Sequence, residues 1–198
     1  MRRILLSMVV TLGLVTTACN GGDDAGLGAV STIPGSSIGP GTTAPPDTTA
    51  GGRPPITAPP VAERAHLTDV RIGARTGGDR VVFEFEPVVP GYTIDFTTRP
   101  ITEDGSGKAV AIEGATLLQV RLENASSARF EGENVVITYN GPRRIKGNGT
   151  TVFAEAVLTG DFEGVLTWVI GLKTPVQTID VAALGAPSRL VIDLPSPG

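Results

Sequence analysis

Asp79-Arg80-Val81-Val82-Phe83-Glu84-Phe85-Glu86 is the stretch of sequence that decides the fold. Its residues alternate with a period of two, as expected for a β-strand that has one face in a core and the other mostly in water. The predicted core face carries Val81, Phe83 and Phe85, and the opposite face carries Val82, Glu84 and Glu86. Pro87 ends this strand, because proline has no amide proton to donate to a neighbouring strand.

The residues on either side of this stretch predict its neighbouring strands. Apolar positions in residues 67–72 lead into Arg75-Thr76-Gly77-Gly78-Asp79, a glycine-rich turn of the kind that joins the two strands of a hairpin. A third alternating strand follows Pro90-Gly91, over residues 92–97. The sequence therefore predicts antiparallel pairing from the start of the domain.

The rest of the chain predicts more short strands separated by glycine. We expect them over residues 110–122, with a break at Gly114, and over residues 135–139, 151–158, 165–172 and 189–194. Short strands between regular turn signals are typical of an antiparallel sandwich or barrel. The predicted fold class is all-β, an antiparallel β-sandwich of short strands.

Two segments differ from the alternating pattern. Residues 165–170, Val-Leu-Thr-Trp-Val-Ile, are apolar on both faces, which predicts a central strand. We therefore expect Trp168 in the core, with stacking on a sugar as the alternative. Residues 178–184 form the only helix-like stretch, of a turn or two at most.

The beginning of the chain has the form of an export signal. Arg2 and Arg3 precede an apolar run over residues 4–15, which is followed by Thr17-Ala18-Cys19. A charged start, a short apolar run and small residues before one cysteine make a signal rather than a membrane span, because the run is too short to cross a bilayer. The protein is expected to work outside the cytoplasm.

Residues 14–19 resemble a lipobox, the motif at which a bacterial lipoprotein signal is cut before an acylated cysteine. Thr16 stands where that motif usually has leucine. The resemblance implies a signal peptide over residues 1–18 and lipid, including palmitate, on Cys19, the only cysteine. Several acyl chains would give stable membrane attachment. The alternative is an ordinary signal peptide and a secreted protein with a free thiol.

Residues 19–64 are rich in Gly, Pro, Thr, Ser and Ala. Such a segment cannot bury enough apolar surface to offset its ordering entropy, so we expect a disordered linker. The folded domain is expected over residues 65–195. In this arrangement the domain lies at the outer face of the cytoplasmic membrane or in the cell wall, held by its lipid anchor.

Charge and cysteine content exclude some classes of protein. The formal net charge is −4, and it becomes −6 once Arg2 and Arg3 leave with the signal. Proteins bind nucleic acids largely through Lys and Arg side chains, which neutralise phosphates and release their counter-ions. An acidic chain is therefore not expected to have a nucleic-acid partner. With one cysteine, no intramolecular disulfide can form after export, so stability must come from packing and strand pairing.

Three strand patterns together resemble a known family. They are residues 67–74, residues 79–85, and the closing Pro187-Ser188-Arg189-Leu190-Val191-Ile192-Asp193-Leu194. They look like an AMIN domain and, more closely, the AMIN-like domain of actinobacterial envelope lipoproteins, over residues 65–194. The resemblance implies a β-sandwich that positions envelope proteins, in some relatives by binding peptidoglycan. The partner expected for this chain is peptidoglycan or another envelope protein.

The sequence offers little for catalysis. His66 is the only histidine and stands at the edge of the domain, where we expect an exposed loop or the start of a strand. Zinc sites and serine triads need more placed ligands or a placed histidine. Gly105-Ser106-Gly107-Lys108 is followed by Ala109 rather than Ser or Thr, so it predicts a hairpin turn and not a phosphate loop. We expect no enzyme, no metal and no cofactor.

Two other functions stay open. One is a carrier of a small apolar ligand inside a β-barrel, with a cavity lined by Phe83, Phe85, Phe96 and Trp168. The other is a glycan hydrolase that uses two carboxyl groups across a groove, for which Glu103, Asp104 and Asp95 are the candidates.

A basic segment, residues 140–149, is the candidate contact with the cell wall. It is predicted as a Gly/Pro loop and carries Arg143, Arg144 and Lys146 in an otherwise acidic protein. Arginine binds carboxylates through two parallel hydrogen bonds, and the peptide stems of a cell wall carry carboxylates. The alternative is a solvated hairpin loop whose charges serve solubility.

Overall fold

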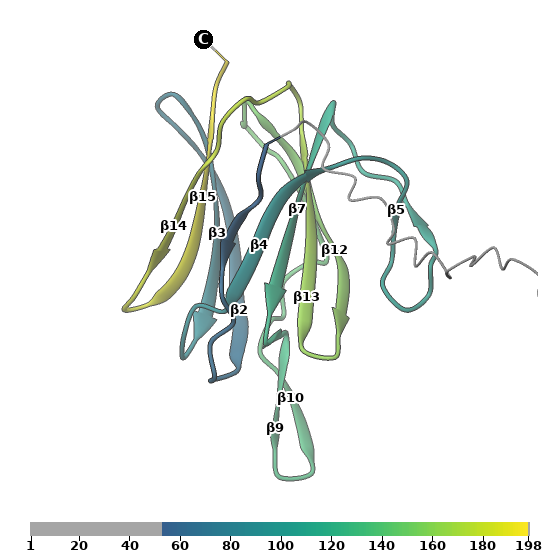
Figure 1. The fold of residues 1–198 in the computed structure, drawn as a ribbon, viewed down its shortest axis with the longest axis vertical. Coiled ribbons are helices and arrows are strands. Elements are labelled where there is room, and N and C mark those ends of the chain that lie inside the picture. Colours follow the sequence, from purple (N-terminus) through teal and green to yellow (C-terminus); the bar gives the residue numbers. More distant parts are fainter. Residues whose placement is uncertain (1–52, 198) are drawn as a thin grey trace, which may run out of the picture. The chain divides into compact units, whose positions relative to one another are not determined.

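The computed structural model describes residues 53–197, and every regular element in them is a β-strand (Figure 1). Two main sheets face each other as the layers of a sandwich, with a core between them. The fold is therefore the all-β antiparallel sandwich that the sequence predicts. Within residues 53–197, no helix is long and apolar enough to cross a membrane.

The two sheets have six and five strands. The six-stranded sheet has the order β1 (Ile56–Ala58), β4 (Gly91–Thr97), β7 (Thr116–Glu123), β13 (Val165–Leu172), β12 (Phe153–Phe162) and β11 (Arg144–Lys146). The five-stranded sheet has the order β14 (Asp180–Leu184), β15 (Ser188–Pro195), β3 (Gly78–Glu86), β2 (Ala65–Arg75) and β8 (Ala125–Ser126). Two hairpins are separate from them, β5 (Ile101–Thr102) with β6 (Ala109–Val110), and β9 (Ala128–Glu131) with β10 (Asn134–Ile137).

The predicted β2–β3 hairpin is confirmed. Val81, Phe83 and Phe85 are almost completely buried, while Glu86 is exposed. The turn depends on Gly77 and Gly78, whose φ angles of 83° and 153° are strained for other residues. A side chain at Gly78 would also collide with the backbone of Leu194 in β15. The glycine pair thus lets β3 run between β2 and β15.

Trp168 lies at the centre of the main core, as predicted. It is fully buried on β13, which lies between β7 and β12. Its ring makes edge-on contacts with Phe83 of the opposite sheet, at 5.8 Å between centroids, and with Tyr139, at 5.9 Å. Such aromatic pairs add specific geometry to the burial of large apolar surface. The two layers are joined by direct ring contact.

A smaller apolar cluster covers the outer face of the six-stranded sheet. Val169 of β13 and Val157 of β12 point away from the main core, and Ile101 and Ile112 from the β5–β6 excursion pack onto them. This explains why β13 is apolar on both faces. Figure 1 shows the excursion lying on that side of the sheet. Its turn at residues 104–106 lies in the segment predicted to form a hairpin turn.

Asp79 makes a link between the sheets that sequence analysis missed. Its carboxylate is fully buried and accepts hydrogen bonds from the backbone amides of Thr151, Val152 and Phe153, at 3.2, 2.6 and 2.8 Å. These amides precede or begin β12, whereas Asp79 is the second residue of β3 in the other sheet. Several N–H donors can stabilise a buried carboxylate, since hydrogen bonds to charged groups are the stronger ones.

The helix-like interpretation of residues 178–184 is wrong, because residues 180–184 form the edge strand β14. They pair with β15 from Asp180 opposite Asp193 to Leu184 opposite Arg189. A helix of one or two turns has little stability of its own, since nucleation is costly. Pairing with β15 supplies backbone partners, and Val181 packs against the main core.

Residues 53–64 differ from the linker expected there. Ile56–Ala58 form β1 and pair with β4, placing Ile56 opposite Ile94 and against the main core. The prolines around β1 suit an edge strand, where an amide proton is not needed on the open side. Cys19 and residues 19–52 lie outside the described residues.

Candidate functional site

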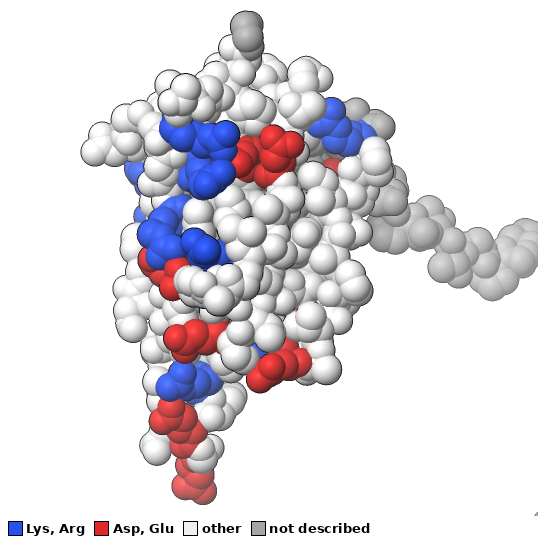
Figure 2. Space-filling view, turned by 90° about the vertical axis from the view of Figure 1, so that its left-hand side faces the viewer, with Lys and Arg blue, Asp and Glu red and all other residues white. Residues whose placement is uncertain are grey.

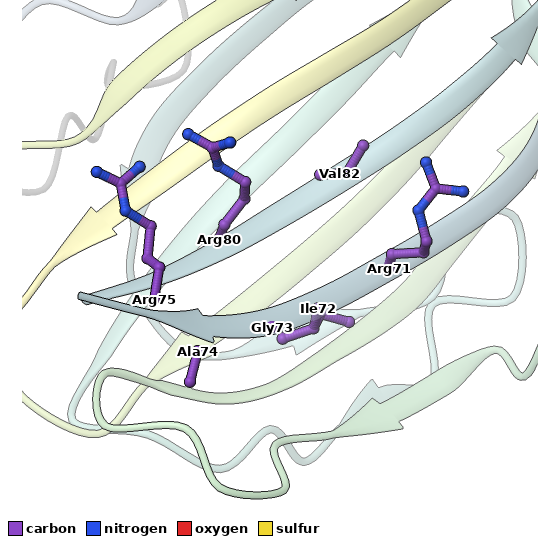
Figure 3. Close-up of a pocket in the computed structure, with 7 residues that line it drawn as sticks. All are labelled: Arg71, Ile72, Gly73, Ala74, Arg75, Arg80 and Val82. Carbon is purple, nitrogen blue, oxygen red and sulfur yellow. The ribbon is translucent and has the colours of Figure 1, made fainter. Parts of the chain in front are cut away.

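An open hollow of about 460 Å³ lies on the outer face of the five-stranded sheet. Arg71 and Arg75 of β2 and Arg80 of β3 line it, together with Gly73 and Val82. In Figure 3 the three arginines and Val82 rise from the same side of the hairpin, and Ala74 points away. We call this hollow, with its three arginines, the arginine groove.

The register of the hairpin creates the arginine groove. Gly73 lies opposite Arg80, and Arg71 lies opposite Val82. Residues 71, 73 and 75 share one face of β2 because side chains alternate along a strand. Gly73 has no side chain, and nothing lies within 4 Å of where its Cβ would stand. The space between the arginines is therefore open to solvent.

Three partly exposed acids hold the guanidinium groups of the arginine groove. Arg80 makes a two-pronged pair with Asp193, at 2.7 and 2.8 Å, and Arg75 reaches the same carboxylate at 2.6 Å. Arg71 bridges Asp69 and Glu84, each at 2.6 Å. Hydrogen bonds from Arg80, and then from Arg75, lower the pKa of Asp193. The pKa of Arg71 is raised chiefly by its hydrogen bond to Glu84.

Figure 2 shows how charge is distributed over this face of the protein. Basic side chains gather in the upper half, with acids between them, and the lowest part of the face is acidic. The arginine side chains are 45–49% exposed and Asp193 is 20% exposed, so these ion pairs are partly accessible to solvent. Ion pairs of this kind exchange partners readily, because each is worth only about 0.2–1 kcal/mol.

The predicted basic segment is arranged differently. Its residues Arg144–Lys146 form β11 at the edge of the six-stranded sheet rather than a free loop. Arg144 contacts Oε1 of Glu155 at 2.6 Å and donates to the carbonyl of Ala111 at 3.0 Å. Lys146 forms an ion pair with Glu113. Two of the three cations thus pair with acids of the same domain.

Glu155 is the buried member of this cluster. Its side chain has 0% exposure, and its Oε1 also accepts the amide proton of Glu113 at 2.7 Å. Its Oε2 has no hydrogen-bond partner among residues 53–197, with Lys146 Nζ at 3.9 Å. A hollow of about 340 Å³ lies beside these residues. The pKa of Glu113 is lowered by its hydrogen bond to Lys146.

Arg143 and the start of the basic segment are also held in place. Arg143 donates to the carbonyl of Leu158 at 3.3 Å. The hydroxyl of Tyr139 donates to the carbonyl of Pro142 at 2.9 Å, and burial raises the pKa of Tyr139 to about 12. The segment is therefore fixed to the core through Tyr139, which packs on Trp168.

The residues considered for catalysis serve local structure. Glu103 accepts a hydrogen bond from Ser106 in the β5–β6 turn, and Asp104 accepts one from Thr167 at 3.0 Å. Asp95 accepts the amide proton of Phe96. His66 is the second residue of β2, and its ring Nδ1 lies 3.1 Å from the carbonyl oxygen of Ala128. Among residues 53–197, no group of three or more His, Cys, Asp or Glu side chains is placed to hold a metal ion.

The interior is filled by side chains of the two sheets. Phe83, Phe85 and Trp168, which were expected to line a ligand cavity in the carrier alternative, are at most 1% exposed and belong to one packed cluster. Phe96 packs at the edge of that cluster. The arrangement is a sandwich with its aromatic rings in contact, and not a barrel around a ligand.

Residues 53–197 thus form a filled two-sheet sandwich with charged hollows on its outer faces. The model of the AMIN-like domain family matches residues 65–196, two thirds of the chain, so the protein belongs to that family. AMIN-like domains occur in proteins of the cell envelope, have roles associated with the cell wall, and generally bind or target rather than catalyse. No curated protein and no solved structure matches the chain.

Proposed function

We propose that this protein is a membrane-anchored lipoprotein whose β domain binds the cell wall through the arginine groove. The lipid would be attached to Cys19, and the ligand would be peptidoglycan or a protein associated with it. Family membership supports a role at the cell wall. The observation that carries the choice of surface is the open hollow lined by Arg71, Arg75 and Arg80.

The chemistry of the arginine groove suits a polymer with carboxylates. Guanidinium groups bind carboxylates in a two-pronged manner, as Arg80 already does with Asp193. A carboxylate of a peptide stem can replace Asp69 or Asp193 at little cost, because these acids are partly solvated. The open hollow on the outer face of the sheet also gives an extended polymer room to lie along the strands.

A pelleting experiment tests wall binding. The full chain, purified in detergent, is mixed with purified peptidoglycan sacculi and centrifuged. We expect the protein in the pellet at low and moderate salt. The variant Arg71→Ser, Arg75→Ser, Arg80→Ser should lose most of this pelleting, because its groove has no guanidinium groups. Protein that stays in the supernatant at low salt would show that the domain does not bind the wall.

A matched control separates the groove from net charge. Arg64→Ser, Arg121→Ser, Arg129→Ser removes an equal number of positive charges from exposed or half-buried positions outside the groove. It should pellet nearly as well as the unchanged chain. Equal losses in both triple variants would mean that binding follows overall charge and not the groove.

The basic segment is the second candidate surface, favoured by the hollow beside Arg144 and Lys146. Arg143→Ser with Lys146→Ser tests it while leaving the Arg144–Glu155 pair intact. We expect pelleting to be retained. A large loss of pelleting with an unchanged unfolding temperature would move the wall contact to this segment.

Lipid attachment has its own test. Cells that make the full chain are labelled with radioactive palmitate, and the protein is isolated. We expect label on the unchanged chain and none on the Cys19→Ala variant. If the unchanged chain carries no label, Cys19 is not acylated, and the alternative of a secreted protein with a free thiol is favoured.

A further inference from the structure

The β9–β10 hairpin extends beyond the end of the sandwich and exposes an apolar face. Figure 1 shows it at the bottom, at the end opposite the C-terminus. Phe130 lies directly opposite Val135, and Ala128 lies opposite Ile137. Side chains opposite each other, and two apart on one strand, point to the same side. Ala128, Phe130, Val135 and Ile137 therefore form one face, which we call the apolar hairpin face.

The exposure of the apolar hairpin face is unusual. Phe130 is 75% exposed, Val135 is 58% and Ile137 is 53%. Phe162, at the neighbouring β12–β13 turn, is 61% exposed. Single exposed apolar residues need no explanation, but neighbouring large ones mark interaction sites. A two-stranded hairpin has little stability alone, so a face whose three large apolar side chains are more than half exposed needs another reason to be apolar.

The base of the hairpin is firmly held, so its apolar face has a fixed direction. Asp161 accepts hydrogen bonds from the amide and the hydroxyl of Ser127. The amides of Thr138 and Tyr139 donate to the carbonyl of Ser127 at 2.8 and 3.1 Å. Tyr139 is buried against Trp168. A partner would meet a surface that is already in position, which reduces the entropy cost of binding.

Charge indicates which partner fits. Residues 123–137 and 161–165, which include the hairpin, its base and the neighbouring turn, contain five acids and one cation, a net charge of −4. The acids are Glu123, Glu131, Glu133, Asp161 and Glu163, and the cation is Arg129. The other residues between 53 and 197 contain 12 acids and 13 basic residues, so the excess of negative charge within residues 53–197 is concentrated at this end.

We infer that the apolar hairpin face is a docking surface for a partner protein whose own apolar patch is bordered by Lys and Arg. A second copy of this chain would bring another charge of −4 to the contact and be repelled. An anionic membrane surface would be repelled for the same reason. A basic partner is attracted, and its apolar patch covers Phe130, Val135 and Ile137. This surface is separate from the arginine groove, so neither proposal depends on the other.

A defined peptide pair tests this surface. The full chain, held in nanodiscs of neutral lipid, is titrated into a labelled amphipathic peptide of leucine and lysine, and into the same peptide with glutamate in place of lysine. Fluorescence anisotropy is measured, with empty nanodiscs as the blank. We expect the leucine–lysine peptide to bind and the leucine–glutamate peptide not to bind. Phe130→Ser, Val135→Ser, Ile137→Ser should raise the dissociation constant at least about tenfold.

A second variant keeps the test decisive if the apolar variant folds poorly. Glu131→Lys, Glu133→Lys leaves the apolar hairpin face intact and reverses the charge at its tip, so it should weaken binding of the leucine–lysine peptide and strengthen that of the leucine–glutamate peptide. Equal binding of both peptides, or unchanged binding by both variants, would overturn the inference. A chain that sediments as a dimer, and as a monomer after the apolar substitutions, would assign the surface to a second copy and overturn it as well.

Discussion

The arginine groove and the basic segment each gather three cations, but their acidic partners differ in burial. In the groove, Asp69 and Asp193 are 46% and 20% exposed. In the basic segment, Glu113 is 64% exposed, whereas Glu155 has no exposed surface. The same kind of ion pair therefore has two roles. In the groove the pairs are open to exchange with a ligand, whereas in the basic segment Arg144 neutralises a carboxylate that water cannot reach.

The comparison shows why a run of basic residues is a poor guide to a binding site. The sequence shows Arg143, Arg144 and Lys146 close together, and it does not show that Glu113 and Glu155 lie beside them. Breaking a buried pair leaves an uncompensated charge, which costs far more than an exposed pair contributes. The presence of one buried acid, Glu155, rather than the number of cations, separates the two regions.

The largest effect is expected from Arg144→Ala. Glu155, whose side chain has no exposed surface, would lose its 2.6 Å ion pair and keep only one cation nearby, Lys146 Nζ at 3.9 Å, so the free energy of unfolding should fall by about 3 kcal/mol. Urea unfolding of the full chain, followed by the fluorescence of Trp168, measures this change. A loss below about 1 kcal/mol would place the Arg144–Glu155 pair in the same class as the groove pairs.

A smaller effect is expected from Gly73→Val, which fills the floor of the arginine groove. The strand geometry accepts valine, and nothing lies within 4 Å of the new Cβ, so stability should change by less than about 1 kcal/mol. Pelleting with sacculi should fall because the hollow is occupied. Ala182→Val on β14, an exposed strand position of the same sheet, is the control and should pellet normally. Normal pelleting of Gly73→Val would argue against ligand entry between the arginines.

Acid should weaken the groove pairs slightly. The pKa of Asp193 is lowered in the folded protein, so its contribution to stability is complete above its ordinary pKa of 3.8 and is lost as the pH falls through the lower, folded value. Because Asp193 is partly exposed, we expect less than about 1 kcal/mol from this group. Urea unfolding between pH 6 and 2.5 should show a shallower acid slope for Asp193→Asn than for the unchanged chain. Identical slopes would contradict this assignment.

The smallest effect is expected from Arg71→Ala, the chemical counterpart of Arg144→Ala. Its partners Asp69 and Glu84 return to solvent when the guanidinium is removed, so the free energy of unfolding should change by no more than about 0.5 kcal/mol. The same urea measurement compares the two variants directly. If Arg71→Ala lowers the free energy of unfolding as much as Arg144→Ala, the burial of Glu155 does not explain the difference between the two regions.

Much of the fold was predictable because its main strands follow local rules. The alternation of Val81, Phe83 and Phe85, and the glycine turn before them, define β3 and its hairpin with β2. Trp168 was predicted in a central strand from neighbours that are apolar on both faces. The edge strands were less predictable, because β1 and β14 are short and gain their structure from β4 and β15 rather than from their own residues.

The candidate site was less predictable than the fold. Arg71, Arg75 and Arg80 are spread over ten residues, and only the register that places Gly73 opposite Arg80 brings them around one hollow. Once a β2–β3 hairpin is assumed, strand alternation places residues 71, 73 and 75 on one face, and this would have indicated that Arg71 and Arg75 lie on either side of a glycine. Pairing of Arg144 with Glu155 could not be inferred, because nothing local to residue 144 indicates which carboxylate is buried beside it.

The short pairing of β1 has a mechanical consequence. A load applied at residue 53 first reaches an edge strand that pairs with β4 at only three positions, whereas β13 pairs along its whole length with β7. We expect β1 to separate from β4 at a lower force than is needed to separate β13 from β7. Its release would free residues 53–58, adding about 20 Å of reach at 3.3–3.6 Å per residue, while Asn124 still holds the carbonyls of Val61 and Ala62. The rings around Trp168 would stay in contact, so the protein could give way under tension without unfolding.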